Sequence, residues 1–402
     1  MTMDYDLIIV GGGMVGASLA MALANSSKRI AIIEAVSPQA AQQPSYDDRG
    51  IALSYGSQRI FEALGLWNAL APFSTAITDI HVSDRGHFGV TRLSAKDEHV
   101  PALGQVITAK AMGYVLNQAI AKQNNLELIC PASVTKLQQH ADHVELQLND
   151  QRTITSQLVV AADGGQSTIR KLLNLGALQH DYQQTAITAN ISTERAHNNQ
   201  AFERFTDTGP IALLPMTDNR CSLVWTVKSG HEAELINLPE QDFLAQLQDR
   251  FGYRLGKLIQ VGERHSYPLR LIQADQPIQH RIVLIGNAAH SLHPIAGQGF
   301  NLGLRDVAVL ADVLSTSDSD VDLGDARLLS SYKSWRLSDQ DSTITATNNL
   351  VTLFSNDNPI LGHLRGAGLS LTDSFPPLKH WLAKKSMGLN DKQPRLSRGL
   401  SL

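Results

Sequence analysis

A glycine-rich turn between an apolar strand and a helix is the feature that most constrains the fold of this chain. Residues 5–10 end in four consecutive aliphatic side chains, which is typical of a buried parallel strand, and Gly11-x-Gly13-x-x-Gly16 follows at once. Residues 14–24 predict a helix rich in Ala and Leu, and residues 29–34 predict a second strand. This strand–helix–strand order predicts a doubly wound α/β domain.

The spacing of the glycines predicts a dinucleotide site. Gly11 permits the tight turn, Gly13 lets the backbone approach a pyrophosphate, and Gly16 lets the helix pack close to the strand. The N-terminus of the helix then offers unpaired N–H groups to the phosphates. Glu34 ends the second strand, 18 positions after Gly16 (34 − 16), where a carboxylate can bind ribose hydroxyls. The alternative is a turn that only packs, but strand, helix and acid together favour the dinucleotide site.

The rest of the chain predicts a discontinuous arrangement of domains. Residues 186–266 alternate short strand patterns with turn residues, which predicts an antiparallel sheet, and the chain is helical from about Leu328. We therefore expect a dinucleotide-binding Rossmann-type three-layer domain from residues 1–76, 101–180 and 267–345. An inserted antiparallel β-sheet substrate domain is expected from 77–100 and 181–266, and a helical C-terminal segment from 346–402.

Two further glycine blocks follow predicted strands. Asp163-Gly164 ends one strand, and Ser167 is placed to cap the next helix; taken alone, a structural turn is the stronger interpretation. Gly286-Asn287 ends another strand. Pro294 and the glycines at 297, 299 and 303 then surround a predicted helix start, which indicates backbone donors turned towards a ligand.

Composition excludes several classes of function. A formal net charge of −4 and a pI near 6.4 do not favour nucleic acid as a partner. The two cysteines and fourteen histidines show no disulfide framework and no zinc spacing, so we expect no metal. The cysteine pattern fits a reducing cytosol. No stretch reaches the roughly 18–20 apolar residues of a membrane span, so we expect a cytoplasmic protein, at most peripheral at the inner face of the membrane.

In this order and spacing, the three blocks resemble the class A aromatic flavin monooxygenases, the family of para-hydroxybenzoate hydroxylase, over most of the chain to about Asp341. The resemblance implies that the first block binds the ADP half of FAD. It implies that Asp163-Gly164 serves both FAD and the pyridine nucleotide, and that the third block meets the ribityl chain and flavin ring. The family usually has Gly-Asp where this chain has Gly286-Asn287. Asn keeps the hydrogen-bonding ability, so we expect FAD binding to survive.

Residues 288–306 resemble the ubiquinone-biosynthesis hydroxylases. Gly286-Asn287 and residues 82–87 and 202–206 point to the branch that acts on 2-polyprenyl-6-methoxyphenol. This resemblance implies that NADPH or NADH reduces the flavin, and that O₂ then hydroxylates a polyprenylated phenol through a flavin C4a-hydroperoxide. Two alternatives stay open. One is an isoprenoid reductase or dehydrogenase that inserts no oxygen. The other is a non-catalytic flavoprotein subunit assembled with other ubiquinone-biosynthesis proteins.

The resemblance also implies which residues form the site. The expected catalytic positions are Pro294, Gln298 and Gly299. The expected cofactor contacts are Gly11, Gly13, Met14, Val15, Gly16, Glu34, Arg49, Gln105, Val134, Asp163, Gly164, Gly286, Asn287, Gly297, Gly299 and Asn301. For Arg49 the alternative is a surface cation, for Val134 an ordinary strand valine, and Gln105 is the weakest candidate.

Several side chains have open roles. The phenol needs a base or hydrogen-bond acceptor, and Tyr182, Glu203 and His293 are equal candidates. His290 reads best as a histidine satisfied by its neighbours. Three aromatic residues are candidates to line an apolar substrate cavity, with core packing as the alternative: Trp225, Phe202 and Phe205.

The C-terminal 52 residues, 351–402, are basic and interleaved with apolar side chains. They hold seven Lys or Arg and three Asp, a balance of +4 (7 − 3) in a chain that is −4 overall. Such an end can rest on an anionic membrane that holds a polyprenyl substrate. A helical tail that covers the core is the equal alternative.

Overall fold

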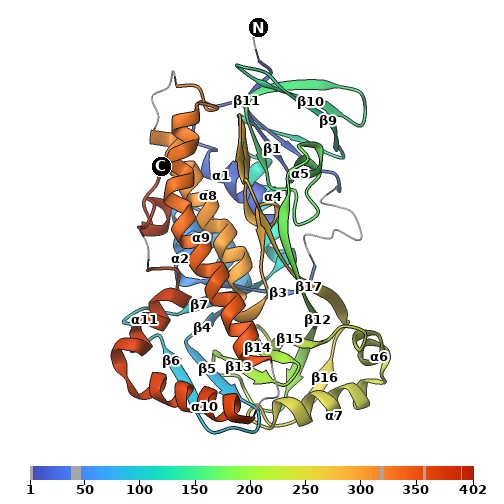
Figure 1. Ribbon diagram of the computed structural model, residues 1–402, viewed down its shortest axis with the longest axis vertical. Coiled ribbons are helices and arrows are strands. Elements are labelled where there is room, and N and C mark those ends of the chain that lie inside the picture. Colours follow the sequence, from blue (N-terminus) through green and yellow to red (C-terminus); the bar gives the residue numbers. More distant parts are fainter. Residues whose placement is uncertain (1–2, 38–46, 317–320, 356–358, 391) are drawn as a thin grey trace.

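The computed structural model describes residues 3–37, 47–316, 321–355, 359–390 and 392–402. Within these residues the chain forms an eight-stranded sheet, a nine-stranded sheet and a small three-stranded sheet between them (Figure 1). Helices flank all three sheets.

The eight-stranded sheet has a parallel centre, because each connection between its strands returns to the same edge. In spatial order the parallel strands are β19 (Ile282–Leu284), β11 (Thr153–Ala161), β1 (Tyr5–Val10), β2 (Ile30–Ile33) and β8 (Leu126–Ile129), with β18 (Ile278–Gln279) antiparallel at the β19 edge. The carboxyl ends of neighbouring parallel strands therefore meet at one edge of the sheet, the position where α/β folds bind ligands.

Both faces of this sheet are covered. The side chains of Leu7 and Ile9 join a core with α1 (Met14–Ala22), α2 (Tyr55–Ala63), α4 (Ala109–Ile120) and α8 (Gln298–Thr316). The side chains of Ile8 and Val10 point the other way, into a core with β9 (Val134–Gln139), β10 (Val144–Leu148) and α5 (Thr168–Leu172). The strand period of two thus divides β1 between two cores, and the predicted three-layer domain is confirmed.

The nine-stranded sheet forms the second part of the molecule. Its strands are β5 (Asp79–Asp84), β6 (Val90–Ser94), β12 (Ala177–Thr193), β13 (Gln200–Thr206), β14 (Gly209–Met216), β15 (Arg220–Lys228), β16 (Leu258–Val261), β17 (His265–Ala274) and β20 (His290–Ser291). All pairs are antiparallel except β5 with β13, so the inserted antiparallel sheet is confirmed with one parallel exception. Helices α6 (Glu232–Asn237) and α7 (Glu240–Phe251) pack on one face.

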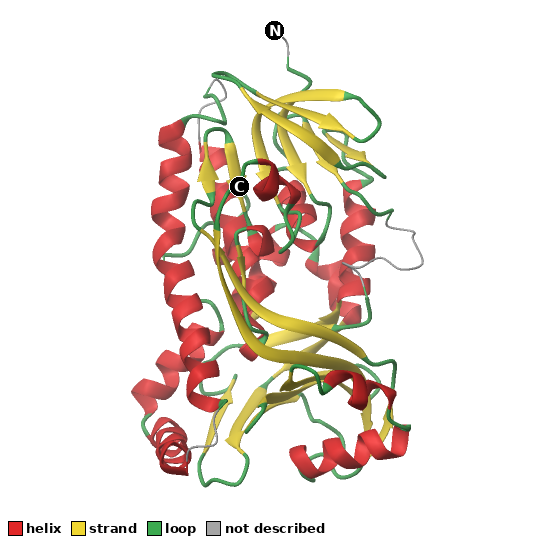
Figure 2. Cartoon of the chain, turned by 45° about the vertical axis from the view of Figure 1, so that its right-hand side comes forward, coloured by secondary structure: helices red, strands yellow, loops and turns green. Residues whose placement is uncertain are grey.

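Two long strands join the two parts. Figure 2 shows β12 and β17 running from the region of the first sheet into the second. Both cross a predicted domain boundary. Strand β12 starts at Ala177, before the boundary at residue 180, and β17 ends at Ala274, after the boundary at residue 266. The division into domains stays a prediction.

The predicted helical C-terminus is confirmed. Helix α9 (Ala326–Phe354) runs along the molecule, and α10 (Pro359–Ser374) and α11 (Pro376–Ser386) lie at its lower end, with α10 against β5 and β6 (Figure 1). The remaining elements are β3 (Gly50–Ser54), β7 (Gly104–Thr108) and β4 (Ser74–Ile77) of the small sheet, α3 (Trp67–Leu70), and the 3₁₀ turns η1 (Ala71–Phe73), η2 (Gly286–Ala288), η3 (Ile295–Gly297) and η4 (Leu396–Arg398).

Candidate active site

The glycine turn lies between β1 and α1 with the geometry that its spacing predicts. Gly11 has φ +104°, and a Cβ there would lie 2.5 Å from the carbonyl oxygen of Ala162. Gly13 is the N-cap of α1, and no side chain caps this helix. The N–H groups of its first turn are therefore available to an anionic ligand such as a pyrophosphate.

Glu34 lies beside this turn, at the carboxyl end of β2. Its Oε2 accepts a hydrogen bond from the backbone N–H of Gly12 at 2.7 Å, and its Oε1 accepts one from Val36 at 2.9 Å. Its carbonyl oxygen accepts a bond from the N–H of Ala132 at 2.8 Å. These bonds fix the carboxylate where ribose hydroxyls of a bound dinucleotide would reach it.

Replacing Glu34 with glutamine is expected to weaken FAD binding about tenfold or more. A glutamine amide has one acceptor oxygen, so its NH₂ group would face either Gly12 N–H or Val36 N–H, and a hydrogen bond to a charged acceptor contributes about 1.5–3 kcal/mol. Flavin fluorescence during dilution of the holoprotein measures the affinity. Glu127→Gln on the neighbouring strand β8 is the control, and an unchanged affinity for E34Q would contradict the assignment.

Asp163 and Gly164 follow β11. One carboxylate oxygen of Asp163, Oδ2, caps α5 by accepting from the N–H groups of Thr168 at 2.7 Å and Ile169 at 3.2 Å. The other, Oδ1, is buried without a partner among the described residues, and burial raises the pKa of this carboxyl. Gly164 has φ +82° and open space where a Cβ would lie. The predicted cap from Ser167 is confirmed, since its Oγ accepts from Arg170 N–H.

The third block contacts the first. Gly286 has φ +55°, and a Cβ on Gly286 or on Gly303 would lie 3.1 Å from a methyl group of Val15. Since β1, β11 and β19 are neighbours in the sheet, all three blocks meet at the same edge. The side chain of Asn287 is exposed there and lines the cavity described below.

A buried ionic network lies behind the third block. Asp306 of α8 is fully buried. Its Oδ2 accepts from the N–H of Gly286 at 3.1 Å and lies 2.6 Å from Nε2 of His290. Its Oδ1 accepts from Nε of Arg336 at 2.8 Å and from Nε2 of Gln340 at 2.9 Å. Burial opposes ionisation of Asp306, but His290 and Arg336 hold the pKa of this carboxyl well below its ordinary value.

The network continues along α9. Asp339 pairs with Arg336 and accepts from Nε of Arg305 at 2.7 Å. Burial opposes its ionisation, yet Arg305 and Arg336 lower the pKa of Asp339 to about 2. These charges tie α8 and α9 to the turn that carries Gly286.

A single large cavity of about 1000 Å³ extends from this edge into the second part of the molecule. Its first wall is the loop from Pro294 to Asn301 together with β3. Its second wall is formed by strands β5, β6, β13, β14 and β15, and its third by helices α9, α10 and α11. Apolar side chains from the two further walls include Ile80, Val82, Leu93, Phe205, Ala212, Leu214, Val224, Leu353, Phe354, Leu369, Leu378 and Leu382.

The loop of the first wall is held by Asn301. Its Oδ1 accepts from the N–H of Ser54 at 2.8 Å, and its Nδ2 donates to the carbonyls of Ala52 and Gly297 at 2.9 and 2.7 Å. The side chain is therefore fully used in joining β3 to the loop. Gly299 has open space where a Cβ would lie, so its backbone faces the cavity.

Arg49 also lines the cavity. Its Nε donates to Oδ1 of Asp47 at 2.7 Å, and its guanidinium lies 4.6 Å from the ring centre of Tyr267. The structure thus brings Arg49, Asn287, Pro294, Gly297, Gln298, Gly299 and Asn301 around one cavity. A partly buried cation at this edge fits a ligand with phosphate groups.

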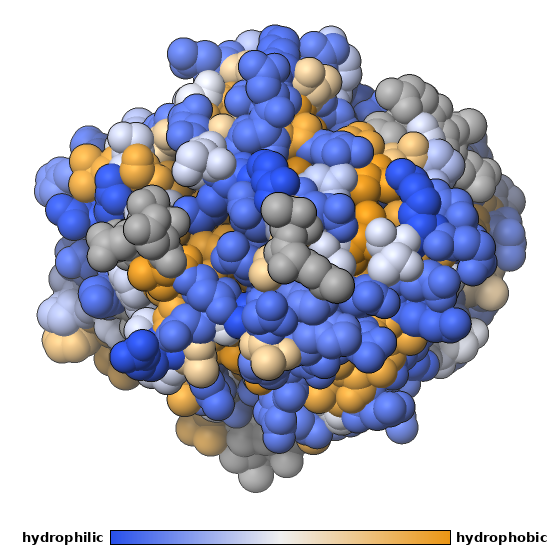
Figure 3. Space-filling view, turned by 90° about the horizontal axis from the view of Figure 1, so that it is seen from above, coloured by the Kyte–Doolittle hydropathy of each residue, from blue (hydrophilic) through white to orange (hydrophobic). Residues whose placement is uncertain are grey.

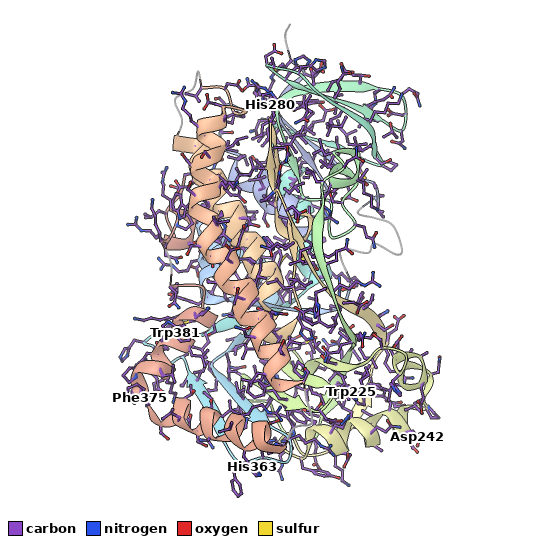
Figure 4. All side chains as sticks on the ribbon, viewed as in Figure 1. Trp225, Asp242, His280, His363, Phe375 and Trp381 are labelled. Carbon is purple, nitrogen blue, oxygen red and sulfur yellow. The ribbon has the colours of Figure 1, made fainter. Side chains whose placement is uncertain are left out.

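The predicted cofactor contacts Gln105 and Val134 are not among the residues that line the cavity. Gln105 on β7 donates to Oε1 of Gln58 at 3.2 Å, and Val134 is buried in the core between β9 and the first sheet. Their roles stay predictions. Phe205 lines the cavity as predicted. Phe202 is also among the lining residues, but its ring packs against Phe251 of α7. Trp225 takes the alternative, core packing. It packs on the opposite face of the sheet against Phe243 of α7 (Figure 4).

Neither the ionic network nor the cavity wall from α10 and α11 is marked by a local pattern in the sequence. Asp306 stands in the third block, but nothing local marks it as buried. In the part of the chain that the structure describes, no cluster of His, Cys, Asp and Glu side chains is placed to hold a metal ion. No helix in the described ranges has the length and apolar character needed to cross a bilayer.

Comparison with known proteins agrees with this geometry. Residues 4–346 match the family described as an FAD binding domain. The chain is 38% identical to ubiquinone hydroxylase UbiL of Rhodospirillum rubrum, covering 99% of this chain and 93% of that one. It is 31% identical to 3-demethoxyubiquinol 3-hydroxylase of Escherichia coli, covering 96% and 98%. The fold matches p-nitrophenol 4-monooxygenase PnpA of Pseudomonas putida with a TM-score of 0.79 at 16% identity, covering 98% and 100%. The chain therefore belongs to the FAD-binding class A flavin monooxygenase family, together with the ubiquinone hydroxylases.

Proposed function

We propose that this protein is an FAD-dependent, NAD(P)H-using monooxygenase that hydroxylates the aromatic ring of a polyprenylated phenol in ubiquinone biosynthesis. The observation that carries the proposal is the continuity of the cavity. One space of about 1000 Å³ joins the Pro294–Asn301 loop, where this family holds its flavin ring, to a long apolar region under α10 and α11. A polar ring with an apolar tail matches such a space.

The residues present fit FAD. The uncapped start of α1 suits the pyrophosphate, Glu34 suits the ribose, and the buried Oδ1 of Asp163 can accept from a cofactor hydroxyl. Bound FAD supplies the redox chemistry with O₂. The chain supplies binding, orientation and a dry environment. The apolar side chains of β13, β14, α9 and α10 exclude water from the end of the cavity where the ring would react.

Hydroxylation is tested by mass spectrometry with ¹⁸O₂ and a short-chain 2-prenylphenol. The proposal requires one labelled oxygen in the product and NAD(P)H oxidation that the phenol stimulates. A reduced isoprenoid without label would support the reductase alternative. A flavoprotein with no turnover at all would support the scaffold alternative. We propose 2-polyprenyl-6-methoxyphenol as the substrate, and the phenol that accumulates in cells lacking the gene identifies the ring position.

We further propose a peripheral membrane contact at the lower end of the molecule. The side chains of Phe88, Leu364, Leu371, Phe375 and Trp381 are between 51% and 96% exposed and form what we name the α10–α11 surface. The turn that carries Phe88 packs directly on α10, since a Cβ on Gly366 would lie 2.1 Å from the Phe88 carbonyl oxygen. Leu364 and Trp381 also line the cavity, so a tail could pass from a bilayer into it.

The opposite end of the molecule has a different surface. Figure 3 shows this upper end, where hydrophilic residues cover most of the face and apolar residues form separate small patches. Figure 4 shows Phe375 and Trp381 in the lower half of the molecule, away from that upper end. The contrast supports a single orientation on a membrane, with α10 and α11 towards the lipid.

Replacing Leu371 and Phe375 together with serine is expected to reduce binding to phosphatidylglycerol-containing vesicles about tenfold or more. Each buried large apolar side chain contributes about 1.5–3 kcal/mol to partition. Co-sedimentation measures the bound fraction. Leu178→Ser, which changes a 57% exposed leucine on β12, is the matched control. Equal sedimentation of all three proteins would end the membrane proposal and leave the hydroxylase proposal untouched.

A further inference from the structure

The cavity offers few groups that could take a proton from a phenol. Among the described residues that line it, Glu203 is the single carboxylate. The other charged side chains in its walls are cations, namely Arg49, Arg270 and Arg365, and Tyr267 lies beside Arg49. A base for a phenol inside this space therefore has to come from Glu203 or from outside the described walls.

Strand β13 directs Glu203 into the cavity. Side chains alternate along a strand, so Glu203 shares a face with Ala201 and Phe205, and all three line the cavity. Its neighbours across the sheet are Val82 of β5 and Ala212 of β14, which also line it. The cross-strand neighbours of the carboxylate on both sides are therefore apolar.

The same strand places Glu203 near the loop that meets the flavin. Phe205, two residues further along the same face, packs in one cluster with Ile295 of that loop and with Phe354 of α9. Pro294 and Glu203 line the same cavity. A ring seated against the loop therefore lies within the part of the cavity that Glu203 faces.

The two other candidates for the base lie outside the lining of the cavity. Tyr182 donates from its hydroxyl to Oδ1 of Asn348 at 3.2 Å, and burial raises its pKa. His293 is fully buried. Its Nδ1 accepts from the N–H of Ile295 and its Nε2 lies 3.2 Å from Oε1 of Gln184, so both ring nitrogens are used. Burial lowers the pKa of His293 to about 4, and neither His293 nor Tyr182 lines the cavity.

We propose that Glu203 is the general base that accepts the phenol proton during hydroxylation, an inference that rests on the proposed function. The O–H bond of the phenol breaks, its proton passes to a carboxylate oxygen of Glu203, and the ring gains electron density where oxygen enters. The ring C–H proton is released when aromaticity returns, and Glu203 returns its proton to the product. With Ar as the ring without the two positions that react, the net reaction is H–Ar–OH + NAD(P)H + H⁺ + O₂ giving HO–Ar–OH + NAD(P)⁺ + H₂O.

Proton transfer to Glu203 takes place as oxygen enters and not before. A free phenol has a pKa of about 10 and a free glutamic acid one of about 4.3, so complete transfer in the ground state is unfavourable. The acidity of the phenol rises as the ring donates electrons, and a positioned acceptor then lowers the barrier. The ionic groups near Glu203 are centred on Asp84, which lies on β5 opposite Phe205. Asp84 forms an ion pair with Arg365, and His87 lies beside it.

The test compares wild type with Glu203→Gln on a short-chain 2-prenylphenol, with product and H₂O₂ measured separately. At pH 7 we expect product formation to fall about 10²–10⁴-fold while FAD stays bound and NAD(P)H oxidation continues as H₂O₂ release. The rate of E203Q should rise about tenfold per pH unit, because only the ionised phenol reacts. An analogue with ring fluorines that bring the phenol pKa below the assay pH should restore most of the rate.

Three controls keep the outcomes separate. Glu263→Gln changes an exposed glutamate and should behave as wild type. Glu203→Asp keeps a carboxylate, so an intermediate rate with the wild-type pH profile supports the proposal even if E203Q loses its flavin. A rate within threefold of wild type for E203Q, or equal losses on the fluorinated and plain phenols, would overturn the proposal. Failure of wild type itself to incorporate ¹⁸O would refute the proposed function, and with it the role of Glu203.

Discussion

Replacing Gly16 with alanine will leave a protein that retains little or no FAD. A Cβ at this position would lie 2.0 Å from the carbonyl oxygen of Gly11 and 3.2 Å from a methyl group of Ile9. Both neighbours belong to β1 or the turn after it, so neither can move without shifting the strand or α1. Overpacking at such a site costs about 3 kcal/mol or more, which corresponds to at least about a 100-fold loss of affinity.

The loss is measured as the ratio of bound flavin absorbance to protein after desalting. Gly262→Ala is the matched control, because a Cβ there would meet Asn190 at an ordinary 3.6 Å and the glycine directly follows β16 of the second sheet. The control should keep its flavin. If G16A also keeps stoichiometric FAD with unchanged affinity, the close approach of α1 to β1 does not determine cofactor binding.

The first βαβ unit could be predicted almost entirely from sequence, because its signals are local. The strand at residues 5–10 and the helix start at Met14 are confirmed. The helix ends at Ala22, two residues before the prediction, since Leu23 leaves helical geometry at φ −104° and ψ 5°. Glycine spacing and an unbroken aliphatic run need no knowledge of distant segments.

Pairing between distant segments could not be predicted. The composition of residues 77–100 placed them with the second sheet, but nothing local indicates that β5 pairs with β13 in parallel. The same limit left Trp225 open between cavity lining and core packing. Strand alternation predicts which side chains of β13 and β15 share a face of the sheet. It does not predict which of the two faces packs against α7 and so forms the core.

For the basic, amphipathic tail, residues 351–402, the sequence allowed two roles: contact with a membrane, or a cover over the core. The structure supports the second alternative directly, because Leu369, Leu378 and Leu382 line the cavity. The membrane contact is also compatible with the structure, since Leu371 and Phe375 of the same tail are exposed and do not line the cavity. A helical periodicity can indicate two apolar sides, but it cannot say what each side contacts.

Replacing Asp306 with alanine is expected to destabilise the fold by about 3–5 kcal/mol and to weaken FAD binding. Removal of one partner from a buried ion pair leaves the other charge uncompensated, here Arg336 at 3% exposure and His290 at 2%. The N–H of Gly286 also loses its acceptor, so the turn that meets the flavin loses its support. Urea unfolding measures the first effect and flavin release the second. Asp150→Asn, which breaks the exposed pair with Arg152, should cause no measurable change.

The same network gives the stability of the protein a specific acid dependence. The folded-state pKa values of Asp306 and Asp339 lie below the unfolded value of about 3.9, so the stabilisation is complete above pH 4 and is lost as pH falls. For Asp339 the loss spans about pH 4 to 2. The wild-type free energy of unfolding should therefore fall steeply in that range, and the curve for D306A should be flatter because one of the two depressed carboxyls is gone. Parallel curves would show that the network contributes no coupled stabilisation, and a flavin affinity unchanged in D306A would separate the network from the cofactor turn.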